Sequence, residues 1–347
     1  MTKLLVLPGD GIGPEITSAT LEVVRAATMG AIETIEMAIG EQSLAQSGST
    51  LPEGVVAAVP QADGVILGPV SHYTYPAGQP NPSAALRTRF QLYANIRPCR
   101  SREGLTILRK AMDLVIVREN TEGFYADRSM HAGPGEFMPD ADSAFAIRKI
   151  TGAAARRVAH AACRLAAARN GRLTIVHKAN VLKLSDGLFL REAKAVAGDY
   201  PGVRVDEVIV DAAAALLVRD PAHFDVIVTT NMFGDILSDE ASELSGSLGL
   251  GASINAGDDI CVAQAQHGSA PDIAGQGIAN PTSLIGSAAM LLDWIGQRKR
   301  DAACRAAAAR IESAIDRVLA DPARRTRDLG GPLGTAAFAQ AMIGELA

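Results

Sequence analysis

The sequence of 347 residues lacks the features that mark several classes of protein. Its four cysteines (Cys99, Cys163, Cys261, Cys304) form no CxxC pair and no metal-binding spacing, which fits thiols in a reducing compartment. Lys and Arg number 33 against 38 Asp and Glu, so the positive charge typical of nucleic-acid-binding proteins is missing. No signal peptide is recognisable, because the apolar segment 4–7 is too short.

Long hydrophobic runs are also missing. The uncharged stretch 273–292 approaches membrane-spanning length, but Asn280-Pro281 interrupts it and Gly, Gln and Ser dilute it. We therefore expect a cytoplasmic protein with neither nucleic acid nor membrane as a partner. Hydrophobic residues make up 48% and charged residues 20%, and the length allows two domains and a large core.

Short apolar runs alternate with helical patterns, which predicts an α/β fold. We expect strands near residues 3–7, 32–39, 63–68, 115–118, 173–176, 203–210 and 224–228, of which the first and the last read as buried and 32–39 as roughly alternating. The first strand leads into Gly9-Asp-Gly-Ile-Gly-Pro14, whose third Gly comes one residue too early for a dinucleotide fingerprint. This glycine-rich segment is more typical of a tight turn at a cleft than of a dinucleotide-binding loop.

The stretch Asn231 to Asp239 follows the strand at 224–228 and has a helical pattern. Asp235 and Asp239 are four residues apart, so both stand on one helix face with no Lys or Arg within four residues. Two carboxylates so placed favour a hard divalent cation such as Mg²⁺ or Mn²⁺. An acidic helix start, favoured by the helix dipole, is the alternative on spacing alone.

Charged residues also stand at the ends of other predicted strands. Lys178 and Asp211 follow two strands, at the edge where α/β proteins place their sites, or they are ordinary solvated side chains. Arginines that can grip carboxylates in a bidentate fork occur at Arg87, Arg97 and Arg118. Three separate surface salt bridges would explain these arginines equally well.

Two loops are candidates for ligand contact. The segment 68–82 is rich in Pro, Gly and polar aromatics, which favours a substrate-side loop that includes His72 and Tyr73. Beyond Asp239 the chain becomes Gly-rich until Gln266, and residues 266–281 then combine small residues with a His and an Asp. This second loop suits a nucleotide, with Asp272 accepting hydrogen bonds from ribose hydroxyls, although an irregular loop without a ligand fits the same residues.

Together these segments resemble the β-decarboxylating dehydrogenases, a family that comprises isocitrate, homoisocitrate and 3-isopropylmalate dehydrogenases. The resemblance runs from residue 5 to residue 331, nearly the whole chain. Five motifs carry it in the family's order: Asn95-Ile-Arg-Pro98, Val117-Arg-Glu-Asn-Thr-Glu-Gly-Phe-Tyr125, Lys178-Ala-Asn-Val181, Asn231 to Asp239, and His267-Gly-Ser-Ala-Pro-Asp-Ile-Ala-Gly275. Each motif alone only suggests this family, whereas all five in the same order are specific for it.

The resemblance implies an α/β isocitrate/isopropylmalate dehydrogenase-like fold, with two domains around a central mixed sheet and no Rossmann fingerprint. Residues 1–92 and 246–347 would form a large, discontinuous cofactor-binding domain. Residues 93–245 would form a small domain with the dimerisation arm and the metal and substrate residues. The family also implies a homodimer whose two active sites each borrow residues from the neighbouring chain.

By position, the resemblance assigns Tyr125 as catalytic acid and Lys178, from the partner chain, as base. Asp235 and Asp239 would bind Mg²⁺ or Mn²⁺ together with Asp211 of the partner subunit. A small di- or tricarboxylate substrate would contact Arg87, Arg97, Arg118, Asn81 and Ser83. The cofactor would contact His267, Gly268, Ser269, Ala270, Pro271, Asp272, Ile273 and Asn280.

The implied reaction is the oxidation and decarboxylation of a 3-substituted (R)-malate. Members of the family that use NADP typically carry a Lys-Tyr pair where this chain has Asp272-Ile273, and a carboxylate there repels a 2′-phosphate. We therefore expect NAD as the cofactor.

Departures from the family pattern bear on the substrate. Ala263-Gln264-Ala265 replaces the usual Phe-Glu-Pro, which removes a carboxylate near the nicotinamide side. The small, polar segment 80–86 supports a pocket for isopropyl poorly, and Asn81-Pro-Ser83 inverts the Ser-x-Asn of isocitrate enzymes. The segments around Arg97 and Lys183 look most like NAD-dependent isocitrate dehydrogenases. Isocitrate is thus favoured and homoisocitrate is next. 3-Isopropylmalate, tartrate or D-malate, and a regulatory non-catalytic subunit, are the alternatives.

Overall fold

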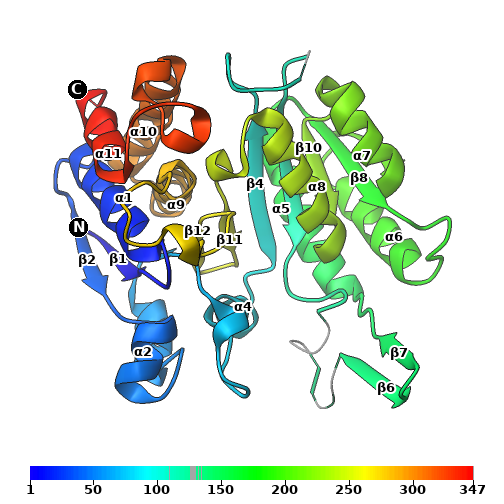
Figure 1. Cartoon of the computed structure of the whole chain (residues 1–347). Coiled ribbons are helices and arrows are strands. Elements are labelled where there is room, and N and C mark those ends of the chain that lie inside the picture. The colour runs from blue at the N-terminus through cyan, green and yellow to red at the C-terminus, as the bar shows by residue number, and fades with distance from the viewer. Residues whose placement is uncertain (109, 126–129, 132, 134, 347) are drawn as a thin grey trace.

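The computed structural model describes residues 1–108, 110–125, 130–131, 133 and 135–346. A ten-stranded mixed sheet runs through the molecule (Figure 1), as expected for an α/β fold. Its strands, in spatial order, are β2 (Ile32–Glu36), β1 (Thr2–Leu7), β3 (Gly64–Leu67), β12 (Cys261–Gln264), β11 (Ile254–Ala256), β4 (Ala94–Arg100), β5 (Asp113–Glu119), β10 (Val226–Thr229), β8 (Arg172–His177) and β9 (Arg204–Ile209).

Both outer parts of the sheet are parallel, and the antiparallel pairs lie in the middle, where β11 pairs with β12 and β4, and β4 pairs with β5. The helices that cover the sheet are α1 (Gly13–Ala27), α2 (Gly40–Ser47), α3 (Glu53–Ala58), α4 (Pro82–Arg89), α5 (Gly152–Ala168), α6 (Ser185–Ala197), α7 (Val210–Arg219), α8 (Asn231–Ser245), α9 (Thr282–Lys299), α10 (Ala302–Ala320) and α11 (Thr335–Gly344).

The inner parallel strands β1, β3, β8 and β10 are almost fully buried, which explains why they appear in the sequence as continuous apolar runs, whereas the edge strands β2 and β9 are partly exposed. On β5, Val115 and Val117 pack in the cluster that contains α5 and α6, whereas Leu114 and Ile116 pack in the cluster that contains α7 and α8. This alternation is the period of two that a strand imposes on its side chains.

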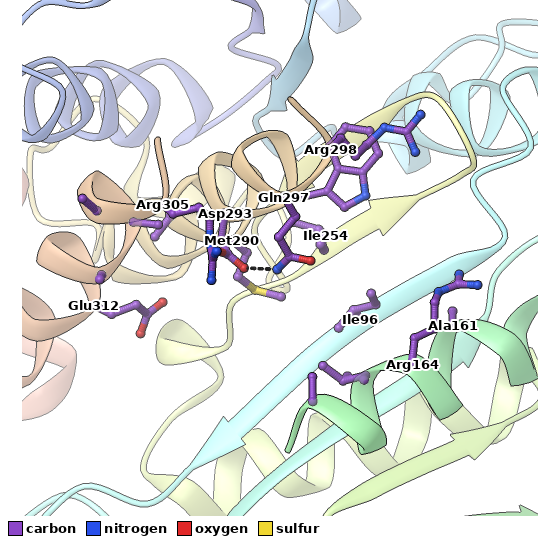
Figure 2. Close-up of a pocket in the computed structure, with 17 residues that line it drawn as sticks. Ile96, Ala161, Arg164, Ile254, Met290, Asp293, Gln297, Arg298, Arg305 and Glu312 are labelled. Carbon is purple, nitrogen blue, oxygen red and sulfur yellow. Dashed lines mark hydrogen bonds and ion pairs between the residues drawn. The ribbon is translucent and has the colours of Figure 1, made fainter. Parts of the chain in front are cut away.

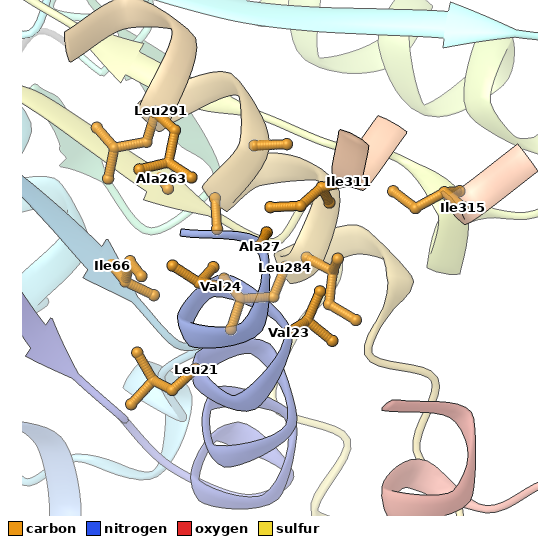
Figure 3. Close-up of a cluster of buried hydrophobic side chains, with 14 of the residues drawn as sticks. Leu21, Val23, Val24, Ala27, Ile66, Ala263, Leu284, Leu291, Ile311 and Ile315 are labelled. Atoms are coloured by element: carbon orange, nitrogen blue, oxygen red, sulfur yellow. The ribbon is translucent and has the colours of Figure 1, made fainter. Parts of the chain in front are cut away.

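The largest apolar cluster joins the two ends of the chain. Side chains of α1 pack against α9 and α10, with Ile66 of β3 and Ala263 of β12 at the sheet (Figure 3). The pairing of β3 with β12 brings Val65 beside Val262. Burial of this cluster holds the N-terminal strands to the C-terminal helices.

A separate hairpin projects from the sheet, seen at the lower right of Figure 1. It consists of β6 (Glu136–Asp140) and β7 (Ser143–Ala146), whose Phe137 and Phe145 rings stack with centroids 5.3 Å apart. Both rings are exposed, at 47% and 53%. The hairpin lies within residues 93–245, the range in which the family resemblance places an arm, and residues 126–129, 132 and 134 before it lie outside the described part of the chain.

Some elements have no clear trace in the sequence pattern. β11 and β12 lie inside the Gly-rich stretch. The strand predicted at 203–210 corresponds to β9, which ends at Ile209, and Val210 is already the first residue of α7. β11 and β12 have three and four residues, mostly buried, so they show no alternation. Among the described residues, no helix is both long and apolar enough to cross a membrane. The proposed division at residues 92 and 245 stays a prediction.

Candidate active site

A row of buried polar side chains crosses the middle of the sheet. In the strand register, Asn255 of β11 pairs with Asn95 of β4, and Asn95 pairs with Arg118 of β5. All three are at most 3% exposed. Directly paired residues lie on the same face of a sheet, and burying polar groups in a core is unfavourable unless they are hydrogen-bonded. This row of buried polar residues therefore indicates a functional site rather than ordinary core packing.

Two arginines on this face contact the acidic side of α8. Arg118 forms an ion pair with Asp235 and donates from Nε to Asn231 Oδ1 at 3.0 Å. Arg97 Nη1 donates to Asp239 Oδ1 at 3.0 Å, and its Nη2 lies 3.3 Å from Asp235 Oδ1. The structure thus brings together four of the residues predicted from the sequence.

The electrostatics of this cluster are suited to anions. Arg97 and Arg118 are buried, at 5% and 3% exposure, and lie close enough to repel each other. Burial, followed by the charge of Arg97, lowers the pKa of Arg118 to about 10. Asp235 offsets part of this repulsion. A bound carboxylate would add to that compensation, because a guanidinium binds a carboxylate through paired hydrogen bonds.

Gly234 allows α8 to pack close to the sheet. A Cβ added at Gly234 would lie 2.6 Å from Arg118 Cβ, which is closer than such atoms pack. The absence of that Cβ lets the first turn of α8 lie against the end of β5. Asp235 follows directly and meets the guanidinium of Arg118.

Arg87 and Ser83 occupy α4 and share a partner on β12. Ser83 Oγ and Arg87 Nη2 each donate to Gln264 Oε1 at 3.0 Å. Asn81 instead accepts a hydrogen bond from the backbone N–H of Ala84 at 3.2 Å and caps the N-terminus of α4. The sequence motif Asn81-Pro-Ser83 therefore has a structural explanation for its first residue, which begins a helix inside the predicted loop.

Lys178 and Asp211 form an ion pair with each other, at the ends of β8 and β9. Hydrogen bonding from Lys178 lowers the pKa of the Asp211 carboxyl. The side chains are 26% and 61% exposed, and within the described part of the chain no hydrogen bond or ion pair joins them to Asp235 or Asp239. Tyr125 lies near enough to Arg118 to influence its charge. Within one chain the predicted site therefore consists of two separate groups.

The residues of α8 fit half of a metal site. Asp235 and Asp239 each engage an arginine through Oδ1, whereas neither Oδ2 atom forms a hydrogen bond with the residues that the structure describes. Among the described residues no cluster of three His, Cys, Asp or Glu side chains could hold a metal ion. Two hard carboxylate oxygens suit Mg²⁺ or Mn²⁺, and a further carboxylate has to come from outside this cluster.

The predicted nucleotide loop lies beside the N-terminal glycine turn. Ile12 donates its N–H to Ser269 O at 2.9 Å, and a Cβ on Gly11 would lie 2.1 Å from that oxygen. The glycine turn therefore shapes a tight turn against this loop. Ala270 has a positive φ of 38°, and Pro271–Ile273 form a short 3₁₀ turn that exposes Asp272. Asn280 instead donates to Asp328 Oδ2 at 2.9 Å.

The loop fits a nucleotide on two further observations. His267 Nε2 is buried and has no hydrogen-bond partner among the described residues. Burial lowers the pKa of His267, so a neutral ring is favoured. Gly268 and Ala270 are exposed, and they leave backbone surface accessible. The Asp272 carboxylate, with no side-chain bond of its own, is available to ribose hydroxyls.

A cavity of about 820 Å³ lies elsewhere, between α5, α9 and α10 (Figure 2). Its wall includes Ile96 and Ile254, which are adjacent in the sheet register. Ile96 neighbours Arg97 on β4, so the two side chains point to opposite faces of the sheet. The cavity therefore lies on the face away from the arginines, and it contains none of the predicted site residues.

Sequence reasoning missed several residues that hold the site together. Asn95 accepts from Arg97 Nε at 2.6 Å, and Ser238 accepts from Arg97 Nη1 at 2.7 Å. Gln266 Nε2 donates to Asp239 Oδ1 at 2.8 Å. All three residues lie within or beside the recognised motifs. A buried arginine needs several hydrogen-bond acceptors, so the polar residues in the motif of Arg97 could have indicated its partners.

Comparison with known proteins gives a consistent result. The family model described as isocitrate/isopropylmalate dehydrogenase matches residues 3–345. An isocitrate/homoisocitrate dehydrogenase of Thermus thermophilus is 43% identical over 343 residues, covering 98% of this chain and 97% of that protein. A 3-isopropylmalate dehydrogenase of Methanothermobacter thermautotrophicus is 40% identical, covering 96% and 95%.

A solved structure agrees with these relatives. The crystal structure of isocitrate dehydrogenase from Methylococcus capsulatus superimposes with a TM-score of 0.88 at 39% identity, covering 100% of this chain and 99% of that one. The fold and the family expected from the five motifs are thereby confirmed. The chain belongs to the isocitrate/isopropylmalate dehydrogenase family and is an oxidoreductase of the decarboxylating dehydrogenase type.

Proposed function

We propose that the protein is a cytoplasmic enzyme that catalyses the NAD-dependent oxidative decarboxylation of a 3-substituted (R)-malate. Isocitrate is the favoured substrate and homoisocitrate is next. The observation that carries the proposal is the pair of buried arginines, Arg97 and Arg118, set against Asp235 and Asp239. Such a cluster offers cationic forks for carboxylates beside carboxylate ligands for a cation.

The arginines hold the carboxylates of the substrate. Arg97 and Arg118 are fixed by Asn95 and Asn231, which accept hydrogen bonds from their Nε atoms. Arg87 approaches from α4 and is held by Gln264. Because these forks are already oriented, little conformational entropy is lost on binding.

The chemistry then needs a base, an acid and two bound groups. Asp235 and Asp239 would hold a divalent cation, which would supply charge stabilisation for the substrate, and the 267–280 loop would hold NAD, which would supply the hydride acceptor. Lys178 takes the hydroxyl proton, directly or through an oriented water. After CO₂ leaves, Tyr125 donates a proton to the carbon that lost it.

We propose that the site is completed in a homodimer. Lys178 and Asp211 form their own ion pair in one chain, apart from α8, so Asp211 of the partner subunit would supply the missing metal ligand. Large exposed apolar side chains lie near both groups: Val181 and Leu184 after β8, and Ile236 on α8. Phe137 and Phe145 of the hairpin are further large apolar side chains that are exposed. Exposed apolar residues gathered in this way are typical of interfaces.

A heterodimer tests this arrangement. Lys178→Met and Asp235→Asn chains, co-expressed with different tags and purified through both, give dimers with one complete and one doubly defective site if sites are shared. We expect about half of the wild-type activity, because one of two symmetric sites is intact. Each homodimer should be almost inactive. An inactive heterodimer that folds and stays dimeric would refute sharing.

A substrate panel tests the reaction itself. The purified chain, with Mn²⁺ and NAD, should form NADH with isocitrate more efficiently than with homoisocitrate, 3-isopropylmalate, tartrate or D-malate. Replacing NAD by NADP should reduce turnover, because Asp272 would repel the 2′-phosphate. Turnover of none of these compounds by a folded dimer would favour a regulatory, non-catalytic subunit instead.

A further inference from the structure

Gln264 links the substrate side of the site to the middle of the sheet. Its Oε1 accepts from Ser83 Oγ and Arg87 Nη2, each at 3.0 Å, and from Asn255 Nδ2 at 3.3 Å. Asn255 is itself oriented, because Asn120 Nδ2 donates to its Oδ1 at 2.9 Å. Three donors on one atom determine which end of the Gln264 amide is oxygen.

The other end of this amide is a pair of N–H donors. No hydrogen bond in the described structure uses Gln264 Nε2, and the side chain is partly accessible. The backbone of Gln264 is fixed in β12, with its carbonyl accepting from Ser287 Oγ at 3.1 Å. A rigidly held amide therefore places two donors beside Ser83 and Arg87.

A carboxylate at this position would behave differently. With Glu, the same oxygens would form an ion pair with Arg87 and offset its charge, and no donor would remain. A neutral amide does not itself neutralise the charge of Arg87, and it adds donors next to it. This combination favours an anionic group on the ligand, whereas an apolar group gains nothing from it.

We propose that Gln264 is a specificity-determining residue that selects substrates with a third carboxylate on the malate 3-substituent. Its Nε2 donates to that carboxylate, while its Oε1 accepts from Ser83 Oγ and Arg87 Nη2 and so holds Arg87 in place. The assignment rests on the proposed function and narrows the substrate to tricarboxylates over 3-alkylmalates and unsubstituted malate. Gln264 acts by direct contact with the substituent and takes no part in proton transfer.

The test is the near-isosteric substitution Gln264→Glu, assayed with isocitrate and with 3-isopropylmalate at saturating NAD and Mn²⁺. The ratio of kcat/KM for isocitrate to that for 3-isopropylmalate should fall by about tenfold or more, because a charge-assisted hydrogen bond is replaced by repulsion. Most of the change should appear in KM for isocitrate. Gln61→Glu adds the same charge on an exposed side chain and should leave the ratio unchanged.

Gln264→Met provides a second variant of similar length without charge, donors or acceptors. It should lower the same ratio by a smaller factor, about threefold to tenfold, since it removes donors without adding repulsion. Equilibrium binding of isocitrate in the presence of Mn²⁺ should weaken in parallel in both variants. Thermal unfolding of each variant checks that the fold is kept.

The outcomes separate this assignment from the proposed function. Turnover by the wild type with an unchanged ratio in both folded variants would overturn the role of Gln264 alone. A change in KM for NAD without a change in the ratio would also overturn it, because the residue would then act on the cofactor. No turnover by the wild type with any malate would overturn the proposed function itself.

Discussion

Among single residues, Asp239, which we propose as a metal ligand, is held in place by two hydrogen bonds. Its Oδ1 accepts from Arg97 at 3.0 Å and from Gln266 at 2.8 Å. Asp239→Asn keeps the shape but removes the negative charge that a hard cation prefers. The Mn²⁺ concentration for half-maximal activity should rise by about tenfold or more, with activity falling in parallel.

The matched control for this variant is Asp259→Asn. Asp259 pairs with Arg298 at 3.0 Å on an exposed surface, with 89% of its side chain accessible. Its loss should change neither activity nor the Mn²⁺ titration. An Mn²⁺ titration that is the same for Asp239→Asn and the wild type would exclude Asp239 as a metal ligand.

Glu122 is a buried acid whose titration affects stability. Burial, with a further contribution from Glu119, raises its pKa from 4.5 to about 7, although Thr151 donates to it. Between these two pH values the folded protein binds more protons than the unfolded chain, so stability falls as pH rises through this window. Above pH 7 the charged, buried carboxylate of Glu122 lowers the free energy of unfolding.

Glu122→Gln removes this titration. The stability of the variant relative to the wild type should increase by about 1 kcal/mol between pH 5 and pH 8, a figure discounted for solvent screening. Urea unfolding at intervals of one pH unit measures the difference. Glu103→Gln, on an exposed side chain, should give a difference that does not depend on pH. A flat difference for both variants would show that Glu122 is not protonated in the folded state.

Among the elements, α8 depends on the lack of a side chain at Gly234. Gly234→Ala places a Cβ 2.6 Å from Arg118 Cβ, so the helix must shift away from β5. We expect a loss of about 1–3 kcal/mol in stability, measured by chemical unfolding, and a marked loss of activity because Asp235 moves with the helix. Gly54→Ala in α3, where the nearest atom is 3.9 Å away, should be neutral or slightly stabilising. Equal stability of the two variants would contradict the tight packing of α8.

The sequence allowed most of these elements to be predicted, for reasons that differ along the chain. Apolar runs marked the strands that are buried on both faces. Thr151, which accepts from Ala154 N at 3.2 Å, is of a residue type that favours the start of a helix such as α5. α4 was hidden by the Pro-rich loop, because Asn81 and Pro82 indicate a turn as readily as a helix start. Short buried strands such as β11 leave no periodic signal.

The candidate site was predictable only in part. Spacing alone could not separate Asp235 and Asp239 from an ordinary acidic helix start, and the resemblance to a family gave them a role. The partners of Arg97 required three-dimensional contacts, because Asn95, Ser238 and Asp239 come from two elements far apart in sequence. The contact of Gln264 with Ser83 and Arg87 likewise spans about half of the chain.

For the whole molecule, the hairpin β6–β7 is expected to be part of the dimer interface. An isolated two-stranded hairpin is marginally stable, and this one exposes Phe137 and Phe145. Replacing both by Asp should shift the protein in size-exclusion chromatography from the mass of two 36.1-kDa chains to that of one. Activity should be lost at the same time if the sites are shared.

Met29→Asp is the matched control, since Met29 is an apolar residue that is 86% exposed in the turn after α1. It should leave both the mass and the activity unchanged. A double hairpin variant that remains dimeric would place the interface elsewhere on the molecule.

The pairing of β3 with β12 has a consequence for biosynthesis. Residues 64–67 can pair with β1 early, but their second neighbour in the sheet, β12, becomes available only when residues 261–264 have left the ribosome. At about 5–20 residues per second, this interval lasts roughly 10–40 s. During this time the apolar face of α1 stays exposed, because α9 and α10, against which it packs, have not yet been synthesised. The nascent N-terminal segment is therefore a natural client for chaperones that bind exposed apolar surface, and slower translation would lengthen its exposure.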